Sequence, residues 1–205
     1  MRQVPQGFGG IARVLFLKGS GRDGGPHDRG VYTGQERKMK AKLKRIKKER
    51  EFLLVSELAH TTWREHYAGV ISNEQIEYML EHFQSVPAIK EAEAKGCEYY
   101  LIRANCADVG YIALEPCNPQ GKMFLSKIYI LKEYRGKGYA RDAINEAAEM
   151  ARGLRLKAIW LTVAKKNTDS IAAYEHMGFV NTEDICKDIG GGFVMDDHIM
   201  ELALQ

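Results

Sequence analysis

Several features that would narrow the function of this 205-residue chain are scarce in it. The four cysteines are irregularly spaced and form no Cys-x-x-Cys pair, so they indicate neither a zinc site nor a disulfide framework. We interpret them as reduced thiols, which favours a cytoplasmic location and predicts no bound metal. No run of about 18 apolar residues occurs, so we predict no membrane-spanning helix.

The chain also lacks a strong charge of one sign, since its net charge is +3. Residues 1–38 contain seven Lys or Arg and three Asp or Glu, which leaves 23 basic and 24 acidic residues in the rest. Nucleic-acid binding therefore has little support from charge. The basic run 38–50 could bind RNA or a membrane, but Leu43 and Ile46 are too few apolar anchors for an interfacial helix. We predict a strand and the start of a helix there.

The first 38 residues differ in composition from the rest. They contain nine of the twenty glycines and show no periodicity, so we predict that they are disordered. Gly34-Gln35-Glu36-Arg37-Lys38 can be encoded by a purine-rich string that contains AGGAG, a bacterial ribosome-binding sequence. One hypothesis is therefore that translation starts at Met39, and the alternative is a genuine flexible extension. Residues 39–205 have the length of one folded domain.

The most informative stretch is Tyr134-Arg135-Gly136-Lys137-Gly138-Tyr139-Ala140. The apolar run 123–131 predicts a strand before it. A helix after it is predicted by apolar residues at 140, 143, 144, 147, 151 and 154. Two glycines permit a tight turn, and the free N–H groups at the helix start point into that turn. Such a turn binds phosphate.

Two other phosphate motifs fit this stretch poorly. A P-loop would need Ser or Thr where Gly138 stands, and a dinucleotide fingerprint would need a third glycine where Arg141 stands. A basic surface turn without a ligand is the remaining alternative.

A second segment follows the helix. Residues 157–163 are nearly all apolar, as expected for a strand buried on both faces of a sheet. Asn167-Thr168-Asp169-Ser170 is rich in N-cap residues, and Gly178 suits the end of the short helix that follows. Strand, helix and strand of this size predict a right-handed parallel crossover.

The other segments complete a mixed α/β sheet with helices on both faces. Helices are predicted over 51–66, 72–84 and 87–95, and strands over 43–47, 98–103, 109–114, 179–187 and 193–203.

Two motifs now support a specific resemblance. Arg135-x-x-Gly138-x-Ala140 resembles the Q/R-x-x-G-x-G/A signature of the GNAT superfamily of acetyl-CoA-dependent N-acetyltransferases. Residues 167–179 resemble the next motif of that superfamily, N-x-x-(A/S)-x-x-x-Y-x-x-x-G-F. The resemblance covers about residues 40–203 and implies a mostly antiparallel sheet of six to seven strands with a splayed central parallel pair. Trp63-x-x-His66-Tyr67 and residues 192–201 look most similar to PaiA-type polyamine acetyltransferases.

The resemblance implies acetyl transfer from acetyl-CoA to a primary amine by direct attack in a ternary complex. Tyr174 would protonate the departing thiolate, because a phenol with a pKa of about 10 is protonated at neutral pH. The alternative for Tyr174 is a packed aromatic residue with a hydrogen-bonded tip. Coenzyme A would contact Ile128, Tyr129, Ile130, Arg135, Gly136, Lys137, Gly138, Tyr139, Ala140 and Asn167.

The resemblance places the amine near Trp63, His66 and Tyr67. Asp196 and Asp197 interrupt an otherwise apolar strand, and such carboxylates need a partner. That partner is either a polyamine cation or a nearby Lys or Arg. The base that deprotonates the amine is not identified, and the candidates are Asp196, Asp197, Glu115, Glu98, His66 and His198.

The leading interpretation is a cytoplasmic N-acetyltransferase of a small primary amine, with a polyamine as the first candidate. Other acceptors are a protein N-terminus, a lysine, an amino acid or an antibiotic amine. Other classes are a CoA-binding module without turnover and a nucleic-acid-binding protein that uses residues 37–50. We predict no nucleic-acid or membrane partner, and a homodimer is one assembly that this interpretation allows.

Overall fold

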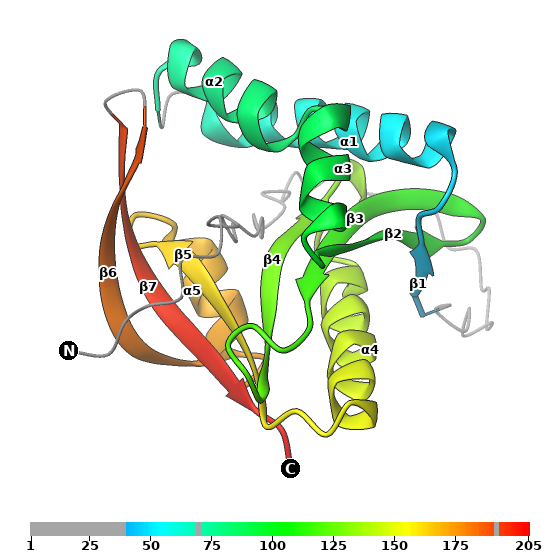
Figure 1. Ribbon diagram of the computed structural model, residues 1–205, viewed down its shortest axis with the longest axis vertical. Helices are drawn as coiled ribbons and strands as arrows, with labels where there is room; N and C mark the ends of the chain where they lie inside the picture. The colour runs from blue at the N-terminus through cyan, green and yellow to red at the C-terminus, as the bar shows by residue number, and fades with distance from the viewer. Residues whose placement is uncertain (1–39, 69–70, 191–192) are drawn as a thin grey trace, which may run out of the picture.

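The computed structural model describes residues 40–68, 71–190 and 193–205 (Figure 1). The predictions for residues 1–38 and for Met39 lie outside the described residues. In chain order the elements are β1 (Lys42–Arg45), α1 (Glu49–Tyr67), α2 (Asn73–Phe83), α3 (Val86–Ala94), β2 (Glu98–Ala104), β3 (Ala107–Glu115), β4 (Lys122–Ile130), the 3-10 helix η1 (Lys132–Tyr134), α4 (Tyr139–Gly153), β5 (Ala158–Ala164), α5 (Thr168–Glu175), β6 (Val180–Gly190) and β7 (Phe193–Ala203). The predicted helices and strands are confirmed, with ends that shift by a few residues.

Capping side chains explain where α2 and α3 begin. The Ser72 hydroxyl accepts a hydrogen bond from the Gln75 N–H at 3.1 Å and so caps α2. Ser85 accepts one from the Ala88 N–H at 3.4 Å, so α3 starts at Val86. Pro87 then lies in the first turn, where its missing N–H costs nothing.

Glu51 fixes the start of α1. Its carboxylate accepts hydrogen bonds from the N–H groups of Lys47 and Lys48 at 2.7 and 3.0 Å. It also accepts one from Lys44 Nζ at 2.8 Å. Helix α1 therefore begins at Glu49, two residues before the predicted start, because the capping carboxylate lies inside the helix.

Seven strands form one sheet in the order β1-β2-β3-β4-β5-β7-β6. Neighbouring strands are antiparallel, except that β4 and β5 are parallel. This parallel pair is short, because 122–124 on β4 pair with 158–160 on β5 and the strands then diverge (Figure 1). A register shift opposite Ala113 and Leu114 makes Ser126 an extra residue in β4. Such a bulge bends a strand, which explains why β4 leaves β5 at this place.

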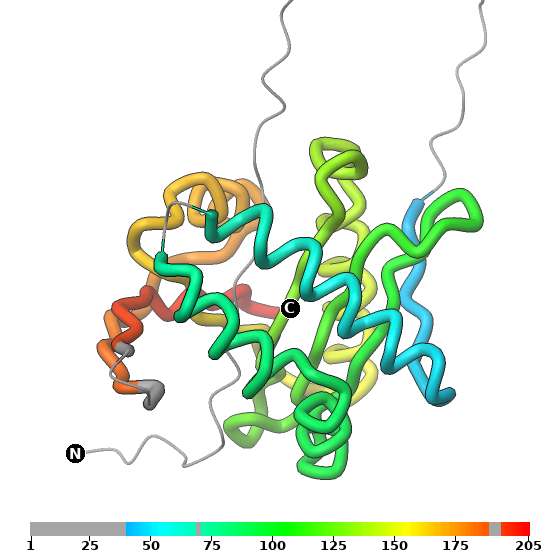
Figure 2. The backbone as a smooth tube through the Cα atoms, turned by 90° about the horizontal axis from the view of Figure 1, so that it is seen from above, coloured from blue at the N-terminus to red at the C-terminus, as the bar shows by residue number. Residues whose placement is uncertain are grey.

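Helices cover both faces of the sheet and create two apolar cores. Helices α1, α2 and α3 lie on one face, over β2, β3 and β4, and α4 lies on the other (Figure 2). Buried residues of α5 belong to the same core as those of α4. None of the helices in the described part of the chain is long and apolar enough to span a membrane.

Two predictions about burial were wrong in detail. Leu154 was placed on the apolar face of α4, but its side chain is 54% exposed because the helix ends at Gly153. Strand β5 was predicted to be buried on both faces, yet only Ile159, Leu161 and Val163 on the α4 face are fully buried with Ala158. The alternate residues of β5 are half-buried, since they face the side where α1, α2 and α3 pack over β2–β4 instead.

Candidate active site

The glycine turn lies where the sequence places it, between the end of β4 and the start of α4. Gly136 and Gly138 have φ angles of +70° and +80°, in the left-handed region that favours glycine. Gly138 is the N-cap of α4, and the N–H groups in the first turn of a helix have no acceptor within that helix. No atom lies within 4 Å of where a Cβ on Gly136 would stand. An anion with several oxygens fits an open turn of this kind.

The divergence of β4 from β5 leaves one edge of β4 unpaired with a strand beyond Phe124. The Leu131 N–H donates to the Val109 carbonyl of β3 at 2.9 Å. Backbone groups alternate along a strand, so those of Ile128 and Ile130 point away from β3 and those of Tyr129 point toward it. An extended chain that carries amides can pair with Ile128 and Ile130 as an added strand would.

The Arg135 side chain points back into the protein. Its Nε donates to the Ile130 carbonyl at 2.9 Å, and its NH2 group donates to Glu65 Oε2 at 3.3 Å. Its side chain is only 5% exposed, and burial lowers the pKa of the guanidinium. Both Arg135 and Lys137 were predicted to contact coenzyme A at the turn. Lys137 of the turn is exposed, and its Nζ lies 5.2 Å from the centre of the Tyr134 ring.

Three other predicted contact residues flank the same turn or the next helix. Tyr139 and Ala140 have buried side chains, so they can offer a ligand only backbone groups. The Asn167 side chain accepts a hydrogen bond from the Ser170 N–H at 3.3 Å and caps α5. Capping was one of the two roles that the sequence left open for Asn167.

Tyr174 is fully buried in α5, and its ring centre lies 5.2 Å from that of Phe179. Burial raises the pKa of its phenol well above the ordinary value, and the phenol of Tyr67 acts in the same direction. Helix α1 crosses the sheet obliquely and ends on the side of α5, which explains this proximity (Figure 2). The raised pKa favours the protonated form of Tyr174 at neutral pH.

The predicted amine-site residues of α1 gather beside β4. The ring centres of Trp63 and Tyr67 are 4.6 Å apart, and that of Trp63 is 5.9 Å from Tyr129. His66 stands against Tyr67 at 4.4 Å and is half-buried. Met195 of β7 belongs to the same core, so two distant parts of the chain meet here. The rings of Trp63, Tyr67 and Tyr129 are all buried in this core. Aromatic rings attract a cation that reaches their faces.

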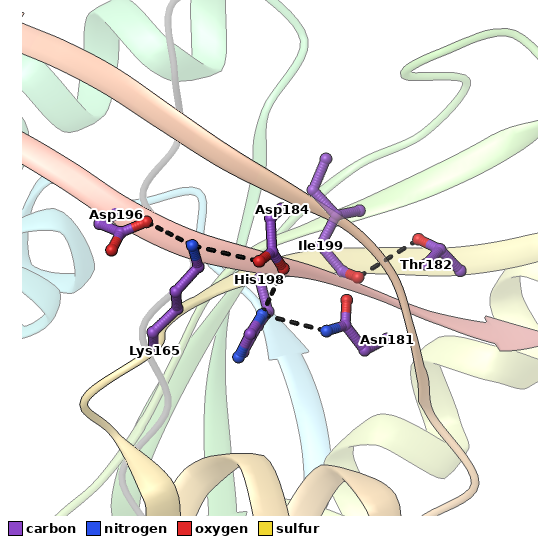
Figure 3. Close-up of polar contacts among 7 residues, drawn as sticks. All are labelled: Lys165, Asn181, Thr182, Asp184, Asp196, His198 and Ile199. Atoms are coloured by element: carbon purple, nitrogen blue, oxygen red, sulfur yellow. Dashed lines mark hydrogen bonds and ion pairs between the residues drawn. The ribbon is translucent and has the colours of Figure 1, made fainter.

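The two adjacent carboxylates of β7 lie on opposite faces of the sheet. Asp196 is exposed and forms an ion pair with Lys165 at 2.6 Å, and Asp184 binds the same ammonium at 3.1 Å (Figure 3). Asp196 therefore has a lysine partner within the protein, which is one of the two predicted alternatives; the other was a polyamine cation. Asp197 is 2% exposed and shares the face of Met195, two residues before it.

The remaining base candidates have protein partners. His198 Nδ1 lies 2.6 Å from Asp184 Oδ1. Glu98 accepts a hydrogen bond from the Tyr100 hydroxyl at 2.5 Å, and Glu115 accepts one from Asn118 Nδ2 at 2.6 Å. Within the described ranges, no group of three or more His, Cys, Asp or Glu side chains could hold a metal ion.

Sequence reasoning missed Glu65 as a functional candidate. Its partner Arg135 lies 70 positions later in the chain, and no local pattern joins two such residues. The sequence also did not show that the Tyr129 backbone faces β3 while its ring packs near Trp63, because the pairing of β4 with β3 decides this orientation.

Comparisons with solved structures identify proteins of the same fold. The fold resembles the structure of PaiA N-acetyltransferase from Thermoplasma acidophilum in complex with coenzyme A, with a TM-score of 0.65, 21% identity and coverage of 80% of this chain and 99% of the other. It also resembles spermidine N-acetyltransferase from Vibrio cholerae in complex with CoA and spermine, with a TM-score of 0.60, 19% identity and coverage of 80% and 96%.

Sequence comparison gives the family. The chain is 33% identical over 73 residues to the uncharacterized N-acetyltransferase YycN of Bacillus subtilis (strain 168), an alignment of 36% of this chain and 47% of that protein. The chain thus matches about half the length of this curated relative. The model of the Acetyltransferase (GNAT) family matches residues 56–179, which contain both motifs. The chain therefore belongs to the acetyltransferase (GNAT) family.

Proposed function

We propose that this protein transfers the acetyl group of acetyl-CoA to a primary amine of a small molecule. One observation carries the proposal: the free edge of β4 leads into the glycine turn, and Tyr174 lies near Tyr67 of the aromatic group that packs on β4. The same fold in Thermoplasma PaiA is in complex with coenzyme A, which supports the choice of acyl donor.

The residues of the turn and the edge fit such a donor. The N–H groups at the start of α4 suit a diphosphate, and Lys137 adds a positive charge beside them. The backbone of Ile128 and Ile130 suits the amides of a pantetheine arm. An N–H at this edge can also polarise a thioester carbonyl, as the donors of an oxyanion hole do.

Tyr174 is our candidate for the general acid. A free thiol has a pKa of about 8.5, so protonation by a phenol of pKa about 10 would cost about 2 kcal/mol. The pKa of Tyr174 is higher than that, because the phenol is buried. A thiolate that forms beside it experiences the same desolvation, which raises the pKa of the thiol as well and keeps the difference small.

The amine must lose a proton before it attacks. For an amine of pKa about 10.4 this costs about 4.6 kcal/mol at neutral pH, which a carboxylate can reduce by accepting the proton. Asp197 is the candidate whose face of β7 is shared with the aromatic group. A buried carboxylate on the face of β7 that carries Met195 of the aromatic core favours a cationic acceptor. A polyamine is our first candidate, and the spermine in the Vibrio enzyme structure supports it.

The test is release of free thiol from acetyl-CoA with a panel of amines. The panel contains spermidine, spermine, free lysine, an aminoglycoside and a peptide with a free N-terminus. We expect the fastest release with a polyamine. Release with another amine alone would contradict the polyamine assignment, and CoA binding without release from any amine would contradict the enzyme assignment.

Tyr174→Phe tests the mechanism. We expect kcat to fall at least about tenfold with little change in CoA affinity, because only the proton is removed. Tyr100→Phe is the matched control, since it removes a phenol that bonds to Glu98 on the far side of β3. Equal kcat values for Tyr174→Phe and wild type would remove Tyr174 from the proposed role.

A further inference from the structure

A salt-bridged contact joins the two halves of the proposed site. Arg135 lies at the start of the glycine turn, and its guanidinium bonds both to the Ile130 carbonyl and to Glu65. We call these three residues the Arg135–Glu65 link. Because Arg135 is only 5% exposed and Glu65 is 37% exposed, the ion pair is partly protected from solvent. Such pairs are worth more than those on an open surface.

The β4 end of this link is held on its other side by β3. Gly110 pairs with Ile130, and a Cβ on Gly110 would lie only 2.1 Å from the Tyr129 carbonyl oxygen. The backbone of β3 therefore approaches β4 more closely than any residue with a Cβ at position 110 would allow. Segment 129–130 lies between Gly110 and Arg135 and has little freedom to shift.

The α1 end of the link lies among the residues of the proposed amine site. Glu65 belongs to the last turn of α1, between Trp63 and the pair His66 and Tyr67. A displacement of Arg135 therefore acts on this turn through an ion pair. The charged groups that face Arg135 are Glu65 and Glu133, and Glu65 is the one that hydrogen-bonds to it.

We propose that Arg135 is a positioning residue which, through Glu65, couples occupation of the glycine turn to the geometry of the last turn of α1. Acetyl-CoA bound at the turn restricts the backbone at Arg135, and the ion pair with Glu65 transmits this restriction to the last turn of α1. The two substrates then bind with positive cooperativity. This inference rests on the proposed function, because it takes acetyl-CoA and an amine as the two ligands. It assigns Arg135 to the protein scaffold rather than to the diphosphate.

The test combines hydrogen exchange with binding. In wild type, coenzyme A is expected to slow amide exchange both in residues 136–143 and in residues 62–68. In Glu65→Gln we expect coenzyme A still to slow amide exchange in residues 136–143 but no longer in residues 62–68. We also expect the gain in spermidine affinity on saturation with coenzyme A to fall about fivefold, at the low end of coupling between sites.

A double-mutant cycle and a control sharpen the test. Arg135→Gln and the double variant Arg135→Gln/Glu65→Gln should lose no more cooperativity than Glu65→Gln alone, because both residues act through one contact. Glu77→Gln is the matched control. It breaks the exposed pair between Glu77 and Arg64, the residue next to Glu65, and should leave both measurements unchanged.

The outcomes separate the inference from the proposed function. If wild type binds coenzyme A and Glu65→Gln keeps both the protection of 62–68 and the cooperativity, the inference is wrong and the function stands. A third outcome is that amide exchange in residues 62–68 of Glu65→Gln is fast both with and without coenzyme A, while the cooperativity between coenzyme A and spermidine is intact. Glu65 then has only a structural role, and the inference is again wrong. If wild type does not bind coenzyme A, both are wrong.

Discussion

Gly110 offers the sharpest test of how the sheet shapes the proposed site. In Gly110→Ala the new Cβ would lie 2.1 Å from the Tyr129 carbonyl oxygen and 3.0 Å from its carbon. Carbon and oxygen atoms need more than about 3 Å, and the obstructing atoms belong to the backbone. The β4 segment must therefore move by about 1 Å away from β3. Overpacking of this kind costs about 1–3 kcal/mol of folding free energy.

The same movement displaces the Ile130 N–H on the free edge of β4. A shift of about 1 Å lengthens a hydrogen bond beyond useful range, and the loss of one such bond is worth about 1 kcal/mol. We therefore expect the Kd for coenzyme A to rise about five- to tenfold, in addition to the loss of stability. Urea unfolding measures the loss of stability, and isothermal titration calorimetry measures the rise in the Kd for coenzyme A.

Gly153→Ala is the matched control. No atom lies within 4 Å of a Cβ at Gly153, the last residue of α4, and its φ is not positive. Alanine favours a helix over glycine by up to about 1 kcal/mol, so this variant should be as stable as wild type or more stable. Wild-type stability and CoA affinity in Gly110→Ala would refute the argument that β3 positions the β4 edge.

Further predictions concern the first helices and the turn. The pKa of Glu51 is lowered from 4.5 to about 2 by its hydrogen bonds to Lys44, Lys47 and Lys48. The contribution of Glu51 to the free energy of unfolding is therefore complete above pH 4.5 and is lost as the pH falls toward 2. Urea unfolding across that window should show this loss in wild type and a smaller dependence on pH in Glu51→Gln. At pH 7 we expect Glu51→Gln to be about 1–3 kcal/mol less stable than wild type. Ser72→Ala should cost about 1 kcal/mol by chemical unfolding, because it removes the cap of α2, and an unchanged midpoint would contradict the cap. Lys137→Gln should weaken coenzyme A binding and reduce its salt dependence; calorimetry at two salt concentrations that gives the wild-type slope would exclude a contact with the phosphates.

Much of the fold follows from local properties of the chain. The glycines of the turn, the caps at Ser72 and Asn167 and the apolar faces of the strands act within a few residues, so a sequence pattern reports them directly. The two motifs also predicted the family that the comparisons confirmed. Local patterns missed the exposed Leu154, because the exact end of a helix depends on what packs against it.

Some features of the proposed site follow from the sequence, and others depend on the tertiary structure. The sequence alone determined which residues form the glycine turn, which helix follows it and that Tyr174 lies on the next helix, since backbone freedom and periodicity are encoded position by position. Only the tertiary structure decided that Arg135 contacts Glu65 instead of facing the turn, and that Asp196 pairs with Lys165 while Asp197 is buried on the opposite face. These outcomes depend on which distant segments meet across the sheet. The burial and the charge partners of a side chain depend on these long-range contacts, so no local sequence pattern predicts them.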